Sequence, residues 1–316
     1  MKKVLILGYG RSGRSAEKYL INKGYEVRII ESIENVIGNL KDTIENLQDY
    51  EFAVISPGIK RTFESPIPVI AEVELPFHFG AKPKTLICVT GTNGKTTVVR
   101  QIYNSLLLSK KNAVLCGNVG MPITSCEIDG RIVVCEISSF MLEECKILHP
   151  NIAVITNVTQ DHLDRHGTFE EYKKIKERIF ENCSKKDKKI LGGTNDEIVK
   201  RVCKILHVKP CLEPPIQKHR IEKVGQRNGM TFYNDSKATN IAATLFAVSK
   251  FKENITLILC GKTKGQDYLE LAQKLPENVK DIIVFGEMTK EVITKIRKAF
   301  AVMCMEEAID TALTLS

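Results

Sequence analysis

The sequence of 316 residues contains no tryptophan, and aromatic residues make up only 6% of it. It therefore lacks the row of aromatic rings on which proteins stack single-stranded nucleic acid. No apolar run approaches the roughly 20 residues that a membrane-spanning helix needs. The apolar run 4–7 ends at Gly8, which makes it too short for a secretion signal. We expect a cytoplasmic protein without a membrane span.

Cysteine-pairing motifs are also absent. The chain has ten cysteines, but none form a Cys-x-x-Cys pair, and Cys88, Cys135 and Cys260 lie in apolar runs. This pattern is typical of small buried side chains in a reducing compartment. It does not favour a disulfide framework or a structural zinc site.

The charge excess is positive but dispersed. The net charge is +8 and the isoelectric point is about 8.9. The densest basic group is short and is best interpreted as a solvated turn; it comprises Lys185, Lys186, Lys188 and Lys189. A small, phosphate-rich substrate accounts for the charge as well as nucleic acid does. Without stacking residues, we expect no nucleic-acid partner.

One glycine-rich loop dominates the sequence: Gly91, Thr92, Asn93, Gly94, Lys95, Thr96 and Thr97. It follows the apolar run 86–89 and precedes a segment with helical apolar spacing at 98–107. Glycines let the backbone approach a phosphate chain, Lys95 and a helix N-terminus supply positive charge, and a hydroxyl at Thr96 can reach a magnesium ion. The loop is shorter than the usual GxxxxGK[ST] consensus, yet it predicts a nucleoside triphosphate site.

A second glycine motif lies at the N-terminus. Gly8, Gly10 and Gly13 form a G-x-G-x-x-G after the strand-like run 4–7, and Glu31 follows a second strand at 27–30. This is nearly the full dinucleotide fingerprint, but the residues leave open whether the ligand is NAD or another pyrophosphate. Another predicted strand, 52–55, ends in a turn of Ser56, Pro57 and Gly58. We place the end of this first domain near Pro83.

Residues 84–218 predict a parallel, doubly wound sheet, because strands at about 112–116, 131–137 and 151–155 alternate with helices. Polar residues follow the strand ends, which converge at one edge of such a sheet. We therefore expect Thr96, Glu136 and His162 to share a magnesium ion. Lys176 lies beside the apolar face of a later helix, and the pattern alone favours a solvated lysine there.

Residues 219–316 predict a third α/β domain. A hairpin at 224–233 turns at Asn228-Gly229, a dipeptide typical of tight β-turns. The polar run 234–240 follows, then an apolar helix at 241–248 and strands at 256–259 and 282–285. The predicted domains are thus 1–83, 84–218 and 219–316.

Together these motifs resemble the Mur ligases, the ATP-dependent amino-acid ligases of peptidoglycan synthesis. The resemblance covers most of residues 1–290. Its most specific part is the run Asn-Asp-Ser-Lys-Ala-Thr-Asn at 234–240, which is most similar to the D-glutamate-adding members; the other parts are 91–97, 117–118, 136–140, 157–167 and 219–222. The resemblance implies three Rossmann-like, doubly wound parallel-sheet domains, the central one a P-loop ATPase domain. It also implies that ATP drives the joining of D-glutamate to UDP-N-acetylmuramoyl-L-alanine through an acyl phosphate.

The resemblance also implies roles for individual residues. The catalytic residues are Lys95, Glu136, His162 and Lys176. Two Mg²⁺ ions are held by Thr96, Glu136, His162 and a carbamylated Lys176, which replaces the solvated interpretation of that lysine. ATP is bound by Gly91, Thr92, Asn93, Gly94, Lys95, Thr96, Thr97, Arg220, Asn234 and Asp235. The UDP-substrate is bound by Gly8, Gly10, Arg11, Ser12, Glu31, Ser32, Ser56, Pro57, Gly58, Asn118 and Ser138. D-glutamate is bound by Lys237, Thr239 and Lys264.

The chain departs from the family pattern in two places. A Gly-x-His-Asn segment is missing before His219, and a late segment that binds the D-glutamate carboxylate would fall beyond residue 316. One alternative is therefore a shortened homologue that binds nucleotide and UDP-substrate without full catalysis. Two further alternatives are a folylpolyglutamate-type ligase and an NAD-dependent oxidoreductase. We expect a monomer.

Overall fold

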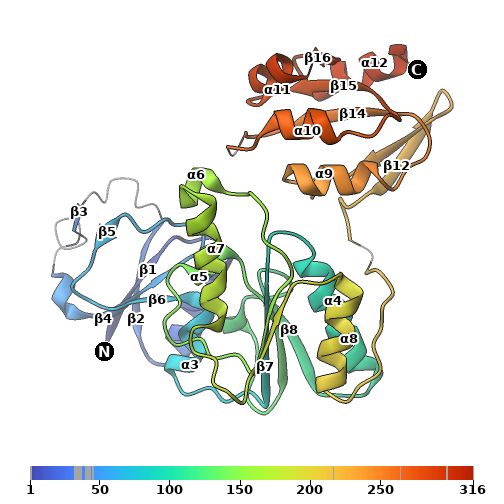
Figure 1. Ribbon diagram of the computed structural model, residues 1–316. Helices are drawn as coiled ribbons and strands as arrows, with labels where there is room; N and C mark the ends of the chain where they lie inside the picture. The colour runs from blue at the N-terminus through green and yellow to red at the C-terminus, as the bar shows by residue number, and fades with distance from the viewer. Residues whose placement is uncertain are drawn as a thin grey trace. The chain divides into compact units, whose positions relative to one another are not determined.

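The computed structural model describes residues 2–31, 38–39, 44, 46–215, 217–263, 265–296 and 298–315. The chain forms two compact units (Figure 1). The first comprises Met1–Val158 and Glu170–Pro215, and the second comprises Thr159–Phe169 and Ile216–Ser316. Both units are α/β with parallel sheets, as the sequence predicts. No helix in the described ranges is both long and apolar enough to cross a membrane.

The first unit begins with a four-stranded parallel sheet in the order β2-β1-β4-β6. Its strands are β1 (Lys3–Leu7), β2 (Glu26–Ile30), β4 (Tyr50–Ile55) and β6 (Val69–Ala71), and a short parallel pair joins β3 (Gly38–Asn39) to β5 (Phe63–Glu64). Helices α1 (Arg11–Asn22) and α3 (Leu75–His78) and the 3-10 turns η1 (Leu47–Asp49) and η2 (Glu72–Glu74) complete this part. The strands predicted at 4–7, 27–30 and 52–55 are confirmed.

A five-stranded parallel sheet forms the rest of the first unit, in the order β11-β10-β7-β9-β8. Its strands are β7 (Thr85–Thr90), β8 (Ala113–Gly117), β9 (Ile132–Glu136), β10 (Ile152–Ile155) and β11 (Lys188–Leu191). Its helices are α4 (Lys95–Leu108), α5 (Ser139–Leu142), α7 (Phe169–Glu177) and α8 (Asn195–Ile205), with the turns η3 (Ile123–Ser125) and η4 (Arg178–Phe180). Strand β7 lies at the centre, so the loop that follows it is flanked by the ends of both neighbouring strands.

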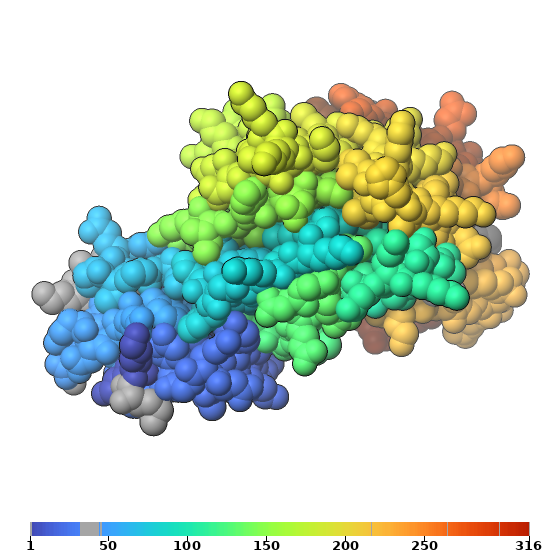
Figure 2. Space-filling model, turned by 90° about the horizontal axis from the view of Figure 1, so that it is seen from below, coloured from blue at the N-terminus to red at the C-terminus, as the bar shows by residue number. Residues whose placement is uncertain are grey.

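Two apolar layers cover the faces of this sheet. On one face, α4 and α8 pack through Val98, Ile102 and Ile198 onto Ile87 and Val89. The layer on the other face includes Cys88, Leu142 and Ile179, and it also takes in Ala71 at the end of β6 and Val73 on η2. The two sheets therefore share a core, and Figure 2 shows the blue N-terminal part packed against cyan and green residues of the central part. The division at residue 83 stays a prediction.

The cysteine prediction holds for most, but not all, of the residues that it named. All ten cysteines are unpaired, and Cys88 and Cys135 are buried on neighbouring strands. Cys260 is exposed, so its predicted burial is wrong. The reason is its position at the last residue of β14, where the strand leaves the core of the second unit.

The second unit contains a hairpin and a three-stranded parallel sheet in the order β14-β15-β16. The hairpin strands are β12 (Glu222–Arg227) and β13 (Met230–Asn234); the sheet strands are β14 (Ile255–Cys260), β15 (Val279–Phe285) and β16 (Ala299–Ala301). The helices are α6 (Leu163–His166), α9 (Ile241–Val248), α10 (Tyr268–Lys274), α11 (Thr289–Lys295) and α12 (Met305–Leu315). Asn228 and Gly229 have φ values of 51° and 79°, which confirms the predicted hairpin turn.

A buried carboxyl fastens the two sheets of the first unit together. Glu72 on η2 is only 2% exposed, and its Oε1 accepts hydrogen bonds from the Thr124 backbone N–H (3.2 Å) and hydroxyl (2.6 Å) on η3. The Thr124 hydroxyl also lies 2.6 Å from the Ser15 hydroxyl on α1. Burial raises the pKa of Glu72, and the two hydrogen bonds from Thr124 offset only part of that effect.

This raised pKa predicts a pH dependence. A carboxyl whose folded-state pKa lies above its unfolded-state value stabilises the fold at low pH and loses that contribution as the pH rises through the folded-state pKa. Glu72→Gln keeps the acceptor oxygen and cannot ionise. We expect the free energy of unfolding of Glu72→Gln minus that of wild type to increase between pH 5 and pH 8, by about 1.4 kcal/mol for each unit of pKa elevation. A difference that stays constant over this range would contradict the account.

Candidate functional site

The loop between β7 and α4 has a shape that only glycine permits at two positions. Gly91 and Gly94 have φ values of 144° and 83°. A Cβ atom at Gly91 would lie 1.9 Å from the Thr156 hydroxyl oxygen, and one at Gly94 would lie 2.5 Å from Oδ1 of Asn195. The backbone thus passes too close to its neighbours for any side chain. The strand, loop and helix predicted around 91–97 are confirmed.

The end of β10 holds this loop in place. The Thr156 hydroxyl donates to the Asn93 carbonyl (2.6 Å), and the Asn157 amide both accepts from the Asn93 N–H (3.0 Å) and donates to its carbonyl (3.0 Å). The Thr92 N–H donates to the Asn157 carbonyl at 2.8 Å. Asn157 is not among the site residues predicted from the sequence. Its position just past a predicted strand next to the P-loop strand was the available signal.

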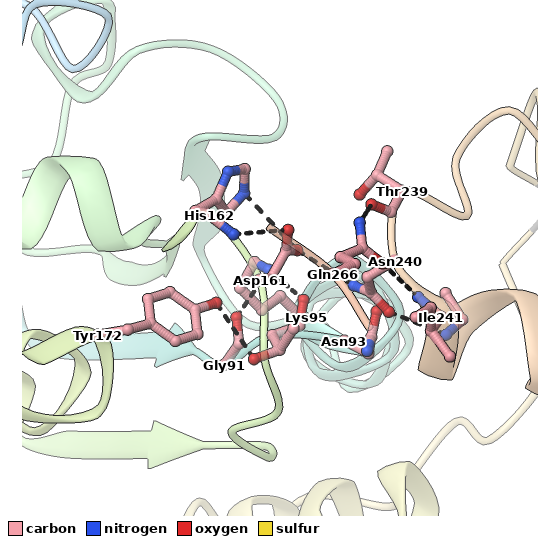
Figure 3. A network of polar contacts seen from close by, with 12 residues as sticks. Gly91, Asn93, Lys95, Asp161, His162, Tyr172, Thr239, Asn240, Ile241 and Gln266 are labelled. Atoms are coloured by element: carbon pink, nitrogen blue, oxygen red, sulfur yellow. Dashed lines mark hydrogen bonds and ion pairs between the residues drawn. The ribbon is translucent and has the colours of Figure 1, made fainter. Parts of the chain in front are cut away.

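Lys95 begins α4 and folds back over the loop. Its Nζ donates to the carbonyls of Gly91 and Thr92, both at 2.8 Å (Figure 3). The first turn of α4 carries no acidic residue. The ammonium group, the N-terminus of α4 and the glycine backbone together give the loop a positive character that suits phosphate.

A buried carboxylate lies beside the loop. Glu136 ends β9 and is 1% exposed; its Oε2 accepts from the Thr96 hydroxyl (2.8 Å) and its Oε1 accepts from the Asn118 amide (2.7 Å). Within the described ranges no lysine, arginine or histidine forms an ion pair with it. Hard oxygen donors around an uncompensated buried carboxylate fit Mg²⁺ chemistry.

Lys176 on α7 is 1% exposed, so the solvated interpretation of this lysine is wrong. Its Nζ donates to the Gly91 carbonyl (2.9 Å) and lies 4.5 Å from the centre of the Tyr172 ring. The Tyr172 hydroxyl lies 3.2 Å from the Thr92 hydroxyl. The neighbouring lysines suggested that Lys176 faces solvent, but the helix packs these side chains against the P-loop. The amine is therefore part of the loop's surroundings.

The N-terminal glycine motif forms a tight turn between β1 and α1. A Cβ at Gly13 would lie 2.1 Å from the Gly8 carbonyl oxygen, and the Ser56 hydroxyl donates to that same oxygen at 2.6 Å. Arg11 starts α1 and donates to the Gly120 carbonyl in the loop after β8. No acidic residue lies in the first turn of α1. These features fit a site for a diphosphate.

The remaining predicted UDP-substrate residues have mixed surroundings. Gly10 caps α1 and Ser12 lies in its first turn, whereas Glu31 is exposed after β2 and Pro57 and Gly58 follow β4. The Ser138 hydroxyl accepts the Met141 N–H at 3.2 Å and so caps α5. Ser32 lies outside the described residues, as does Lys264 of the predicted D-glutamate set.

In the second unit, Asp235 lies among polar partners at the end of the hairpin. Its Oδ1 accepts the Ile221 N–H (3.1 Å) and lies 3.8 Å from the Arg220 guanidinium. Burial raises the pKa of Asp235, opposed by that hydrogen bond and by Arg220. Asn234 approaches the His219 ring at 3.0 Å. Lys237 and Thr239 are exposed in the loop that follows.

His162 also belongs to the second unit, although it follows β10 of the first in the sequence. The prediction that it shares a magnesium ion with Thr96 and Glu136 therefore stays a prediction. In the parts of the chain that the structure describes, no three His, Cys, Asp or Glu side chains gather into a metal site of their own. The first unit brings Lys95, Thr96, Asn118, Glu136 and Lys176 around one loop.

A phosphate-binding loop at the centre of a parallel sheet, with a hydroxyl and a buried carboxylate beside it, is typical of proteins that bind nucleoside triphosphates. The model of the Mur ligase middle domain matches residues 89–266, and that of the Mur ligase glutamate ligase domain matches residues 219–316. The chain belongs to the Mur ligase family, whose members are ATP-dependent ligases. Neither matching model is that of an oxidoreductase.

Curated relatives agree with this assignment. Enzymes named UDP-N-acetylmuramoylalanine–D-glutamate ligase from Koribacter versatilis and Acidobacterium capsulatum are 31% and 30% identical to the chain. Both alignments cover 100% of this chain, and they cover 89% and 88% of the relatives. They extend over 409 and 411 positions, so the relatives contain internal segments that have no counterpart among these 316 residues. This chain is a shortened member of the family.

Solved structures share the fold. MurF from Thermotoga maritima in complex with ADP has a TM-score of 0.62 at 15% identity, covering 99% of this chain and 88% of its own. MurC from the same organism has a TM-score of 0.57 at 15% identity, with coverages of 98% and 92%. E. coli FolC in complex with DHPP and ADP has a TM-score of 0.55 at 12% identity, with coverages of 77% and 85%.

The contacts of Asn157 predict its effect on nucleotide binding. Asn157→Ala removes two side-chain hydrogen bonds to Asn93, each worth about 0.5–1.5 kcal/mol. We expect the affinity for a fluorescent ATP analogue to fall by roughly 5- to 150-fold, with a decrease in melting temperature no larger than that of the control variant. Asn182→Ala is the matched control, since it removes two hydrogen bonds to the carbonyls of Lys146 and Leu148, which lie outside the loop. An equal loss of affinity in both variants would show that the effect of Asn157→Ala does not arise from its contacts with the loop.

Proposed function

We propose that the chain joins D-glutamate to UDP-N-acetylmuramoyl-L-alanine at the expense of ATP, in cytoplasmic peptidoglycan precursor synthesis. The names of the curated relatives support this choice of substrates. The observation that carries the proposal is the buried Glu136 carboxylate, held by Thr96 and Asn118 beside a phosphate-binding loop. A cytoplasmic location fits ten unpaired cysteines.

The reaction begins with activation of the L-alanine carboxylate. A carboxylate oxygen attacks the γ-phosphorus of ATP, the bond to the β–γ bridging oxygen breaks, and ADP leaves with that electron pair. Negative charge crowds the site during this step. Lys95 is well situated to balance it, since its ammonium already lies over the loop carbonyls. Mg²⁺ bound by Thr96, Glu136 and His162 would further neutralise the phosphates.

The second step forms the amide. The amine of D-glutamate attacks the carbonyl carbon of the acyl phosphate, the tetrahedral intermediate collapses, and phosphate leaves with the C–O electron pair. The attacking neutral amine loses one proton, which the departing phosphate or water accepts, and the amide nitrogen keeps the other. We assign Lys237, Thr239 and Lys264 to the D-glutamate, and Arg220, Asn234 and Asp235 to the nucleotide. The loop glycines and hydroxyls, Gly91 to Thr97, bind the ATP phosphates.

Lys176 would bind a second Mg²⁺ after carbamylation. Its amine is buried and directed at the Gly91 carbonyl, so it already lies next to the loop. Addition of carbon dioxide to the neutral amine replaces a cation by an anion with two oxygen donors, which is what a magnesium ion requires.

The UDP part of the substrate would bind at the N-terminal turn. Gly10, Ser12 and the α1 N-terminus would offer backbone N–H groups to the diphosphate, Gly8 would let the turn approach it closely, and Arg11 would add charge. Glu31, Ser32, Ser56, Pro57 and Gly58 would contact the uridine part, and Asn118 and Ser138 the rest of the substrate. We expect a monomer.

A second candidate is a homologue that binds nucleotide and UDP-substrate without completing catalysis. The internal segments that the relatives have and this chain lacks favour it. It predicts nucleotide binding but no turnover, so a single assay separates the two.

The test is phosphate release by the purified chain with ATP and Mg²⁺. A ligase is expected to release phosphate only when both UDP-N-acetylmuramoyl-L-alanine and D-glutamate are present. Folded protein that binds nucleotide but releases none would support the second candidate.

Lys176→Ala supplies the control within the same assay. Loss of the carbamate should abolish turnover, and a short carboxylate such as acetate should restore part of it by occupying the vacated volume. Full activity of this variant without acetate would rule out the carbamate.

A further inference from the structure

The segment 159–169 leaves the first unit after Val158 and returns to it at Glu170, yet it belongs to the second unit. It contains His162, which the proposed function assigns as a ligand of a magnesium ion. The sequence motifs assign no role to the residue before it, Asp161, or to Asn240, the last residue of the run 234–240. Both side chains are buried, with 3% and 5% exposure.

Asp161 and Asn240 are joined across 79 positions of sequence. The Asn240 amide nitrogen donates to Oδ2 of Asp161 at 3.1 Å (Figure 3). The other side of the Asn240 amide is fixed as well, because its Oδ1 accepts the Ala243 N–H at 2.9 Å and thereby caps α9. One asparagine thus connects the start of a helix in the second unit to the segment 159–169.

Asp161 in turn holds His162. Its Oδ1 accepts the His162 N–H at 2.9 Å, and its Oδ2 lies 3.7 Å from Nε2 of the imidazole. His162 has a left-handed backbone with φ of 54°, which costs a residue with a Cβ about 1–2 kcal/mol. The N–H groups of Arg165 and His166 donate to the His162 carbonyl at 3.1 and 3.0 Å. The strained conformation is therefore fixed on both sides.

We propose that Asp161 and Asn240 are positioning residues, whose hydrogen bond fastens the segment 159–169, and His162 with it, to the N-terminus of α9. His162 is then carried by the C-terminal unit. Its availability to a metal ion depends on that unit, although the chain before Thr159 and after Phe169 belongs to the P-loop unit. The role toward Mg²⁺ rests on the proposed function; the attachment of the segment does not.

The test uses a reciprocal exchange of the two side chains in the full chain. Asn240→Asp keeps the oxygen that caps α9 but sets a carboxylate against Asp161. Asp161→Asn keeps the oxygen that accepts the His162 N–H but sets two amide nitrogens against each other. In the double variant, the amide at position 161 can donate to the carboxylate at position 240. The acceptors for the Ala243 N–H and the His162 N–H both remain.

Hydrogen–deuterium exchange is the first measurement. Each single variant should exchange at least tenfold faster than wild type within 159–169, with 241–248 unchanged, and the double variant should regain most of the protection. Asn278→Asp is the matched control, because it removes amide hydrogen bonds to Phe251 and Glu253 in the same unit. Unchanged exchange in the single variants, or no recovery in the double variant, would overturn the proposal.

The Mg²⁺ concentration for half-maximal phosphate release is the second measurement. Each single variant should need at least fivefold more Mg²⁺, and the double variant should return toward wild type. A purely structural role would lower the amount of active enzyme without moving this midpoint. Wild type that releases no phosphate would contradict the proposed function, while the exchange data would still decide the attachment.

Discussion

One carbonyl oxygen, that of Gly91, accepts hydrogen bonds from two lysines. Lys95 reaches it from the start of α4 at 2.8 Å and Lys176 from α7 at 2.9 Å. The contact is possible because Gly91 adopts a φ of 144° and lies against Thr156 with no room for a side chain. The loop, two helices and the ends of β7 and β10 are thus fixed relative to one another, and Thr96 and Glu136 face each other as a result.

Much of this arrangement could be predicted from local sequence. Apolar runs with glycine turns located β1, β2, β4 and the P-loop, and Asn228-Gly229 located the hairpin. These features depend on short-range backbone preferences. Lys176 could not be located in this way, because its flanking lysines suggested solvent and its burial arises only when α7 packs on the loop. The sequence could not indicate the roles of Asn157, Asp161 and Asn240 for the same reason, because each acts through a partner distant in sequence.

The chain retains a complete core in both units although it is shorter than its relatives. In the second unit, α9, α10 and α11 cover one face of the sheet, and α12 covers the other through Ala308 and Ala312. In the first unit, Glu72 and Thr124 still join the two sheets. The described residues thus include the contacts that shape the P-loop and those that hold His162. Catalysis by this chain stays a proposal, and phosphate release decides it.

The most direct measurement follows an oxygen atom. UDP-N-acetylmuramoyl-L-alanine labelled with ¹⁸O in its carboxylate is incubated with the chain, ATP, Mg²⁺ and D-glutamate, and the released phosphate is analysed by mass spectrometry. Passage through an acyl phosphate transfers one labelled oxygen to phosphate for every amide bond formed. Phosphate released without the label would mean that water, not the substrate carboxylate, receives the phosphoryl group, and it would contradict the account.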